Sequence, residues 1–250
     1  MCLILIAWRT SERFPLVIAA NRDEYYARPS ESARWWPEYP EILAGRDLQG
    51  GGTWLGITRS GRVAALTNYR DPKSQRDDAP SRGHLVLDFL RGAQSPQDYV
   101  AALRATADTY NGFNLLLGDL KQLFVFSNVS TRLETVEPGV HGLSNHLLDT
   151  PWPKVERGKK AVQKTLSTLP DTSALFLALK DQQIAADEAL PDTGIGIEME
   201  RCLSPPFIHF PNYGTRCSTV LLAGKSVLFE ERSFGANGEE RGRIAQSWAI

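Results

Sequence analysis

The sequence has few of the features that mark secreted, membrane or nucleic-acid-binding proteins. Its 250 residues carry 28 basic and 29 acidic side chains, so the net charge of −1 argues against nucleic acid or an anionic membrane as main partner. The apolar run Cys2–Trp8 is too short to span a bilayer, and it lacks the basic leader and cleavage site of a signal peptide. The sequence therefore predicts a cytoplasmic protein with no transmembrane segment and no nucleic-acid partner.

Cysteine is also scarce. The three cysteines, Cys2, Cys202 and Cys217, are odd in number and show no CxxC spacing. This pattern argues against a disulfide framework and a structural zinc site, and it fits reduced thiols in the cytoplasm. We therefore expect no metal site.

Paired short apolar runs predict four antiparallel hairpins. Their strands span residues 2–8 with 16–20, 53–58 with 62–69, 113–118 with 122–127, and 215–222 with 226–232. Helical patterns lie at 84–91, 95–108, 153–169 and 172–181. Residues 3–6 and 115–117 are apolar at successive positions, so those strands need cover on both faces. We predict an α+β fold, a four-layer αββα sandwich of two antiparallel sheets, formed as a single domain over residues 1–250.

Three segments allow more than one interpretation. Residues 184–212 are rich in glycine and proline and predict a long loop that covers a site. The glycines at 50–52 favour either a tight turn into the strand that begins at residue 53 or a close approach of the backbone to a ligand or a neighbouring strand. The aromatic residues between 25 and 39 either line an apolar pocket or pack a loop onto the sheet.

Cys2 is the first candidate for catalysis, because it directly follows Met1. Aminopeptidases remove methionine ahead of small residues, which would expose an α-amino group with a reference pKa of ~7.7–8.0. That amine can accept the thiol proton, so an N-terminal cysteine carries its own base. The alternative is a buried cysteine with a packing role.

The polar run Asn21-Arg22-Asp23-Glu24 follows the second predicted strand. Because the first two strands form a hairpin, this run is expected near Cys2, where a carboxylate would hold the terminal ammonium and an arginine would favour the thiolate. The alternative is a solvated turn.

The same run resembles the signature of the NRDE family, also called the transport and Golgi organization 2 family. Further matching segments lie at 44–47, 51–56, 64–70, 142–145, 151–154 and 213–216. The family is similar to the N-terminal nucleophile hydrolases, nearest the bile-salt hydrolase and penicillin V acylase group. The resemblance implies a mature N-terminal cysteine on a four-layer αββα sandwich.

The resemblance also implies roles for single residues. Cys2 matches the nucleophile, and Asp23 matches the carboxylate that holds the free amino group. Asn145 resembles an oxyanion donor, Asn68 another asparagine of the site, and Arg216 the arginine that faces the nucleophile. The residues expected to bind substrate are Asn21, Arg22, Trp54 and Tyr69.

One position departs from the acylase pattern. The acylases have an arginine three residues before the aspartate, where this sequence has Ala20, and the nearest arginine is Arg22. Neighbouring strand residues point to opposite faces, so Arg22 is not expected to reach the thiol of Cys2. Activation of the thiol is therefore expected to be weaker, or to work through Arg216.

The main prediction is cleavage of a small amide or thioester by Cys2, with no required cofactor. The resemblance implies an alternative, a non-catalytic protein that binds or transports haem, or handles lipid or acyl-CoA, in the same cleft. The candidate haem ligands are Cys2, His84, His141, His146 and His209, although no His-x-His or CxxCH spacing is present. A third interpretation is an inactive scaffold that acts through protein contacts.

Overall fold

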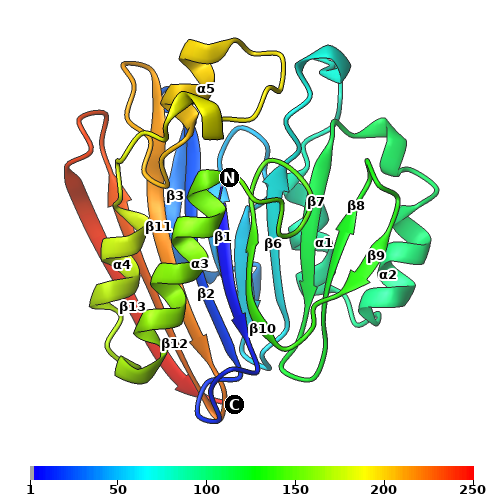
Figure 1. The fold of residues 1–250 in the computed structure, drawn as a ribbon. Coiled ribbons are helices and arrows are strands. Elements are labelled where there is room, and N and C mark those ends of the chain that lie inside the picture. Colours follow the sequence, from blue (N-terminus) through cyan, green and yellow to red (C-terminus); the bar gives the residue numbers. More distant parts are fainter. Residues whose placement is uncertain (1–2) are drawn as a thin grey trace.

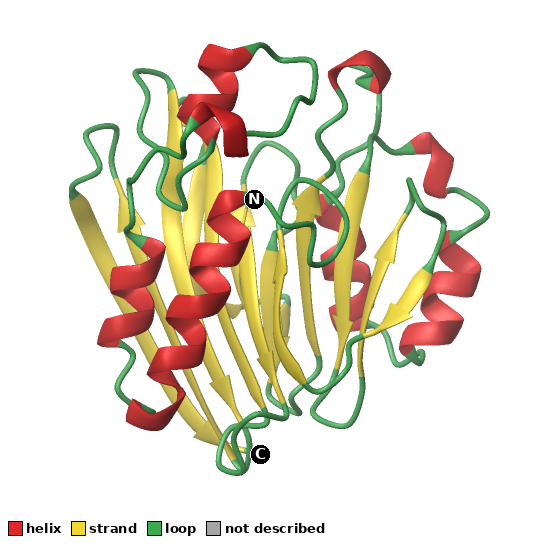
Figure 2. Cartoon of the chain, viewed as in Figure 1, coloured by secondary structure: helices red, strands yellow, loops and turns green. Residues whose placement is uncertain are grey.

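The computed structural model describes residues 3–250, in which two antiparallel sheets pack face to face between layers of helix (Figures 1 and 2). The first sheet has the order β10-β1-β2-β11-β12-β13, with β1 Leu3–Trp8, β2 Leu16–Tyr25, β10 Gly139–Leu143, β11 Tyr213–Ala223, β12 Ser226–Phe234 and β13 Glu240–Ala249. The second runs in sequence from β3 to β9, with β3 Ser30–Trp36, β4 Tyr39–Asp47, β5 Leu55–Thr58, β6 Val63–Asn68, β7 Phe113–Gly118, β8 Leu123–Ser127 and β9 Leu133–Thr135. All four predicted hairpins are present.

Helices cover the outer face of each sheet. The helices are α1 Gly83–Arg91, α2 Pro96–Leu103, α3 Pro153–Thr165, α4 Ser173–Leu179 and α5 Ile197–Leu203. Helices α3 and α4 pack on the first sheet, and α1 packs on the second (Figure 1). This arrangement confirms the predicted four-layer sandwich.

Strand β1 shows why its residues are apolar at every position. Ile4 and Ile6 belong to the core between the two sheets, whereas Leu3 and Leu5 belong to the core beneath α3 and α4. Alternate side chains of a strand point to opposite faces, so each face of β1 needs its own apolar set. Full burial of one such side chain stabilises the fold by about 1.5–3 kcal/mol.

Helix α2 is shorter than the pattern over 95–108 predicts. The expected start is confirmed, because the Ser95 hydroxyl caps the helix by accepting from the amide of Asp98. The helix ends at Leu103, whose carbonyl accepts from the backbone amide of Thr106 at 3.0 Å. That tighter bond ends the α-helical ladder, and a separate short 3₁₀ turn follows at Ala107–Thr109.

The glycine run 50–52 forms the predicted turn, and its close approach is to the start of a helix instead of a neighbouring strand. Gly51 has φ of +77°, which allows the turn into the next strand. A Cβ atom on Gly52 would lie 2.3 Å from the carbonyl carbon of Gly83, at the start of α1. The backbone of the turn therefore packs directly against the first residue of that helix.

Residues 184–212 lie across one end of the sandwich and include α5, seen in yellow at the top of Figure 1. Their position above the ends of β1, β2 and β11 fits the covering role predicted for this segment. No helix within residues 3–250 is long and apolar enough to cross a membrane.

Candidate functional site

The polar run that follows the second predicted strand is part of that strand. Asn21, Arg22 and Asp23 lie within β2, and each has at most 4% of its side chain exposed. Leu3, at the start of β1, pairs with Asn21, so the run lies beside the beginning of β1 as predicted. A solvated turn is thereby excluded. Cys2, the predicted nucleophile, lies outside the described residues.

Asn21 joins β2 to two other segments. Its Nδ2 donates to the carbonyls of Leu179 and Pro206, both at 2.8 Å, and its Oδ1 accepts from the Ser218 hydroxyl at 2.6 Å. Both polar atoms of the amide are therefore used within the fold. The end of the sandwich holds two cavities, of about 620 and 410 Å³, and Asn21 lines neither of them. Its predicted contact with substrate stays a prediction.

Asp23 has one carboxylate oxygen in use and one without a partner. Its Oδ1 accepts from the Thr215 hydroxyl at 2.6 Å, and the residue is 2% exposed. No hydrogen bond reaches Oδ2 from any residue between 3 and 250. A buried carboxylate oxygen without a donor is costly, so this position calls for a hydrogen-bond donor or a cation.

Arg22 points toward the layer between the two sheets. Its guanidinium stacks on the Trp54 ring at 4.2 Å, lies 3.7 Å from an oxygen of Asp47, and donates to the Ser30 hydroxyl at 3.3 Å. These contacts fix a buried cation close to the start of β1. Arg22 and Trp54, both predicted to bind substrate, are brought together by the structure.

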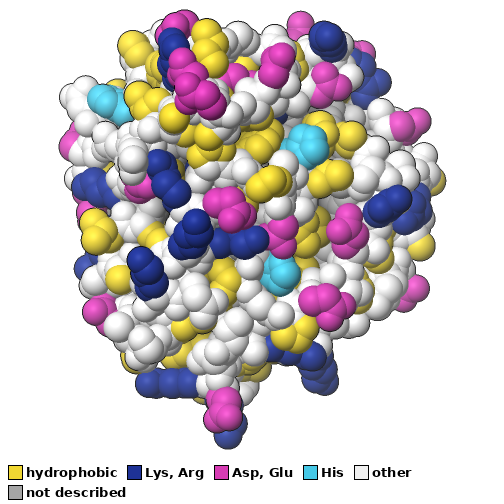
Figure 3. Space-filling model, in the orientation of Figure 1, with side chains coloured by type: hydrophobic (Ala, Val, Ile, Leu, Met, Phe, Trp, Pro, Cys, Tyr) yellow, Lys and Arg dark blue, Asp and Glu magenta, His cyan; other side chains and the backbone are white. Residues whose placement is uncertain are grey.

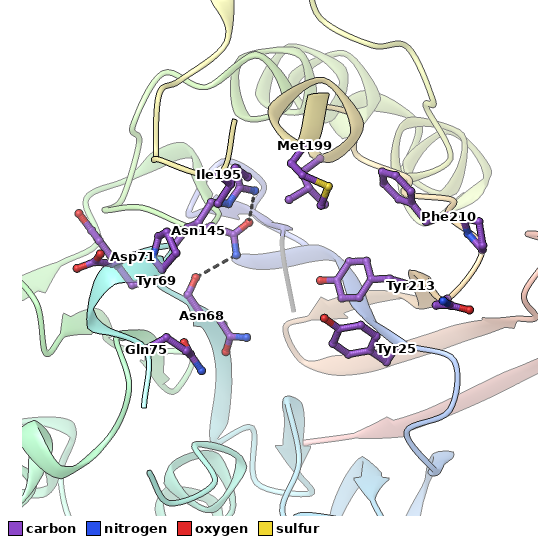
Figure 4. A pocket seen from close by; sticks show the side chains of 15 residues that line it. Tyr25, Asn68, Tyr69, Asp71, Gln75, Asn145, Ile195, Met199, Phe210 and Tyr213 are labelled. Carbon is purple, nitrogen blue, oxygen red and sulfur yellow. Dashed lines mark hydrogen bonds between the residues drawn. The ribbon is translucent and has the colours of Figure 1, made fainter. Parts of the chain in front are cut away.

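Two cavities meet at the end of the sandwich. The apolar cavity has a volume of about 620 Å³, and its wall includes Tyr25, Asn68, Tyr69, Asn145, Met199, Phe210 and Tyr213 (Figure 4). In the space-filling view, hydrophobic side chains gather beneath α5 on this part of the surface (Figure 3). The polar cavity has a volume of about 410 Å³, and its wall includes Arg22, Arg28, Asp47, Trp54 and Asn68.

Asn68 stands where the two cavities meet, since it lines both. It ends β6, and its side-chain amide points into the open space (Figure 4). Its backbone carbonyl accepts from Nδ2 of Asn145 at 3.0 Å. Asn145 follows β10 and is 5% exposed. The structure thus brings together the two asparagines that the sequence predicted for the site, and with them Tyr69.

Arg216 lies apart from both cavities. It sits at the bulge of β11, where one guanidinium nitrogen donates to the carbonyls of Tyr25 and Arg28, both at 2.9 Å. It lines a smaller cavity, of about 180 Å³, together with Arg22 and Cys217. Burial and the nearby charge of Arg22 lower its pKa. Its predicted role opposite the nucleophile stays a prediction.

None of the four histidines lines the apolar or the polar cavity. His141 is hydrogen-bonded to Asp149, and that contact raises the pKa of His141. His146 stacks between Tyr69 and Trp152, and burial lowers its pKa. No cluster of three or more His, Cys, Asp and Glu side chains suited to a metal ion occurs in the described part of the chain.

The aromatic residues between 25 and 39 divide between the two interpretations. Tyr25 lines the apolar cavity and meets Tyr213 edge to face at 5.2 Å. Trp35 and Trp36 pack instead within the fold, where Trp35 meets Trp248 and the indole of Trp36 donates to the backbone.

The sequence patterns did not point to three charged residues beside Asn145. Arg70, Lys154 and Glu200 are at most 12% exposed, and they connect Asn145 to α5. Arg70 and Lys154 do fall within the segments 64–70 and 151–154 that carry the family resemblance. That was the one signal for them, because neither residue stands out by type or spacing.

Comparison with known proteins gives both sequence relatives and structural neighbours. A family model described as Transport and Golgi organisation 2 matches residues 1–235. The chain is 38% identical over 261 residues to the Transport and Golgi organization protein 2 homolog of Bos taurus, and 36% identical over 259 residues to that of Homo sapiens. Each alignment covers 93% of this chain and 93% of the relative.

Two solved structures share the fold at low identity. A variant of conjugated bile acid hydrolase from Clostridium perfringens matches with a TM-score of 0.52 and 9% identity, over 100% of this chain and 97% of that one. The Caenorhabditis elegans ortholog of N-acylethanolamine-hydrolyzing acid amidase matches with a TM-score of 0.52 and 8% identity, over 88% of this chain and 92% of that one. This similarity shows the N-terminal nucleophile hydrolase fold.

Proposed function

This chain belongs to the Transport and Golgi organisation 2 family, and from that premise we propose that it is a hydrolase of small amides or thioesters. Its nucleophile is the thiol of Cys2, which becomes N-terminal when Met1 is removed. The observation that carries the proposal is the buried oxygen of Asp23, beside the start of β1, which has no partner among residues 3–250.

The position of Asp23 supports a role in binding the terminal ammonium group. Leu3 pairs with Asn21 in antiparallel register, so Asp23 lies beside the end of the strand that directly follows Cys2 in the sequence. A cation beside Oδ2 offsets the cost of burying the carboxylate. The same contact would hold the amine where it can accept the thiol proton.

Arg22 supports the thiolate in this proposal. Residues two positions apart in a strand project to the same face, so Arg22 shares with Ala20 the face that includes Ile4. A buried guanidinium near a thiol favours the thiolate form. Arg22 would thus supply the charge that the acylases draw from an arginine at the position of Ala20.

Asn68 and Asn145 supply the oxyanion contacts. Nδ2 of Asn145 uses one N–H on the Asn68 carbonyl and has a second to donate, and the side-chain amide of Asn68 points into the cavity. Amide donors aimed at the developing negative charge stabilise the tetrahedral intermediate.

The reaction has two steps. The sulfur of Cys2 bonds to the carbonyl carbon, the C–N or C–S bond breaks, and the leaving group takes the proton held by the α-amino group. Water then attacks the resulting thioester and gives a proton to the amine. The acid is released and the thiol is restored. The apolar cavity would hold the acyl part of the substrate.

Reversible haem binding is the second proposal, supported by the aromatic wall of the apolar cavity. Among the described residues, the side chains on that wall able to ligate haem iron are Met199 and the tyrosines Tyr25, Tyr69 and Tyr213, since no histidine lines it. Haem titration followed by absorbance, with Met199→Leu as the variant, tests this alternative directly.

Peptide mass spectrometry after brief treatment with limiting iodoacetamide tests the hydrolase proposal. We expect Met1 to be absent and Cys2 to label well below the reference thiol pKa of ~8.5. Cys202 and Cys217 are internal controls, because burial raises the pKa of both thiols. Retention of Met1, or labelling of Cys2 no faster than Cys202, would overturn the proposal.

A panel of fluorogenic amides and thioesters of graded acyl length follows. Turnover by the wild type should disappear in Cys2→Ser and persist in the matched variant Cys202→Ser. Activity that survives Cys2→Ser would assign the reaction to another group.

A further inference from the structure

We propose that Arg70 and Lys154 are positioning residues that orient the amide of Asn145 and couple it to α5, the helix over the apolar cavity. This inference rests on the oxyanion role proposed for Asn145. Arg70 and Lys154 orient the Asn145 amide, and a shift of α5 changes that orientation.

Three donors converge on one atom of the Asn145 side chain. The Arg70 guanidinium, the Lys154 ammonium and the Ser144 hydroxyl each lie 3.4 Å from Oδ1. An amide turned the other way would direct its NH₂ group at two cations and its oxygen at the Asn68 carbonyl. The two charges therefore fix the orientation that presents Nδ2 to Asn68 and to the cavity.

The same two cations also bind α5. Arg70 donates from its other terminal nitrogen to Oε2 of Glu200 at 2.7 Å, and Lys154 donates to the carbonyl of Leu203 at 3.1 Å. Glu200 is 3% exposed and Lys154 is 2% exposed, so these contacts lie in a low-dielectric environment where they are strong. Each cation thus bridges the oxyanion donor and the covering helix.

Helix α5 also forms part of the cavity wall. Met199 and Leu203 line the apolar cavity, and Met199 directly precedes Glu200. Met199 is 45% exposed, so an apolar molecule in the cavity has a large side chain of α5 to press against. A shift of α5 would move Glu200 and the Leu203 carbonyl, and through the two cations it would reach Asn145.

The indole of Trp152 supports both cations from below. The Arg70 guanidinium lies 4.9 Å and the Lys154 ammonium 6.0 Å from the ring centre. The backbone amide of Arg70 also donates to the carbonyl of Asn145 at 2.8 Å. Contacts outside α5 therefore hold Arg70 and Lys154 close to Asn145. The contacts of the two cations with α5 are the ones that a ligand in the cavity can change.

The test is the side-chain amide resonance of Asn145 in ¹⁵N-labelled protein, assigned by its loss in Asn145→Asp. Glu200→Gln removes the charge that anchors α5 to Arg70. The matched control is Glu198→Gln, which makes the same change on the same helix at a residue 79% exposed and paired with Arg201. We expect the Asn145 resonance to shift in Glu200→Gln and to stay in place in Glu198→Gln.

Decanoate serves as the apolar probe. It should shift the Asn145 resonance in the wild type and in Glu198→Gln, and much less in Glu200→Gln. If neither Glu200→Gln nor decanoate changes the chemical shift of the Asn145 amide, the proposed coupling is wrong. Equal shifts in the two variants would overturn it as well, because the effect would then be one of charge alone.

A second pair of variants repeats the test on α3 in case Glu200→Gln fails to fold. Lys154→Met should shift the Asn145 resonance, and Lys160→Met, at an exposed position of the same helix, should leave it unchanged. If both leave it unchanged, Lys154 does not position the amide.

Turnover separates this inference from the proposed function. On a substrate from the panel, Glu200→Gln should lower kcat about tenfold, with Glu198→Gln within twofold of the wild type. If NMR shows the coupling but no substrate is turned over, the proposed hydrolase function is refuted and the coupling is retained. Turnover with a silent Asn145 resonance and unchanged kcat in Glu200→Gln would refute the coupling alone.

Discussion

Replacing Asn145 with aspartate should separate the chemistry of the site from its stability. The change exchanges one NH₂ group for an oxygen and leaves the shape of the side chain almost unaltered. The oxyanion donor is lost, while the oxygen facing Arg70 and Lys154 becomes part of a carboxylate.

The stability change should be small because opposing effects cancel. The charge-assisted bonds from Arg70 and Lys154 become ion pairs with a carboxylate, and after the cost of burying that charge they add roughly 2 kcal/mol. Loss of the bond from Nδ2 to the Asn68 carbonyl costs about 1 kcal/mol, and the facing oxygens cost about as much again. We expect the free energy of unfolding to stay within about 1 kcal/mol of the wild-type value.

Catalysis should fall much further. Removal of one oxyanion donor typically lowers kcat by about 10²–10³, equivalent to about 2.7–4 kcal/mol. The assay combines kcat on a substrate from the panel with urea unfolding of the same preparation. Turnover within fivefold of the wild type would refute the oxyanion role of Asn145.

Asn128→Asp is the matched control. Its Nδ2 donates to the carbonyl of Ala107 at 2.9 Å, and Asn128 lines neither the apolar nor the polar cavity. This variant should lose stability and keep its turnover, the reverse of Asn145→Asp. A loss of stability above about 3 kcal/mol in Asn145→Asp would contradict the amide orientation assigned here.

Three further predictions concern the frame around the site. Gly52→Ala should lower the free energy of unfolding in urea by about 2–4 kcal/mol, because the new Cβ would lie 2.3 Å from the carbonyl carbon of Gly83; wild-type stability would contradict that close approach. Partial burial raises the pKa of Asp149, but hydrogen bonds from His141 and other neighbours dominate and lower it from 3.8 to about 2. The stabilisation is therefore present at neutral pH and is lost as the pH falls through about 2. With solvent screening of a carboxylate that is 33% exposed, Asp149→Asn should cost about 1 kcal/mol at pH 6 and nothing below pH 2. The contact with Asp149 raises the pKa of His141, so the stability difference between the wild type and Asp149→Asn should shrink again as the pH rises through the pKa of His141. A stability difference that does not depend on pH would exclude the ionic contribution. Finally, burial raises the pKa of Cys217 well above its usual value, so iodoacetamide should label it at pH 8 only in urea, and rapid labelling of the native protein would show that the thiol is accessible.

Two of the strands that the sequence did not predict lie at the edges of their sheets. Strand β13 is largely exposed, and β3 mixes charged with aromatic side chains. The four hairpins were predictable because apolar runs flank short polar turns, which is a local pattern. A mostly exposed edge strand has no such pattern, and it forms because a neighbouring strand offers its hydrogen bonds.

The candidate site also combines residues that local sequence patterns reveal with contacts that only the packing of distant elements creates. The motif containing Asp23 and the segment containing Asn145 could be found from the sequence, and hairpin geometry placed Asp23 beside the start of β1. The solvated-turn alternative for 21–24 fell because β2 continues through these residues between β1 and β11. Residues distant in the sequence, such as Leu179, Pro206 and Trp54, contact the polar side chains at 21 and 22.

The layers, the four hairpins and the residue types of the site follow from local patterns in the sequence. Which of those residues meet was decided by the tertiary structure. Arg70 and Glu200 are 130 positions apart, and Arg70 and Asn145 are 75 apart, yet they form one buried group. Periodicity reports which face of an element is buried, because neighbours in sequence share that constraint. It carries no information on which distant charge will satisfy a buried one, since that depends on how all the elements pack together.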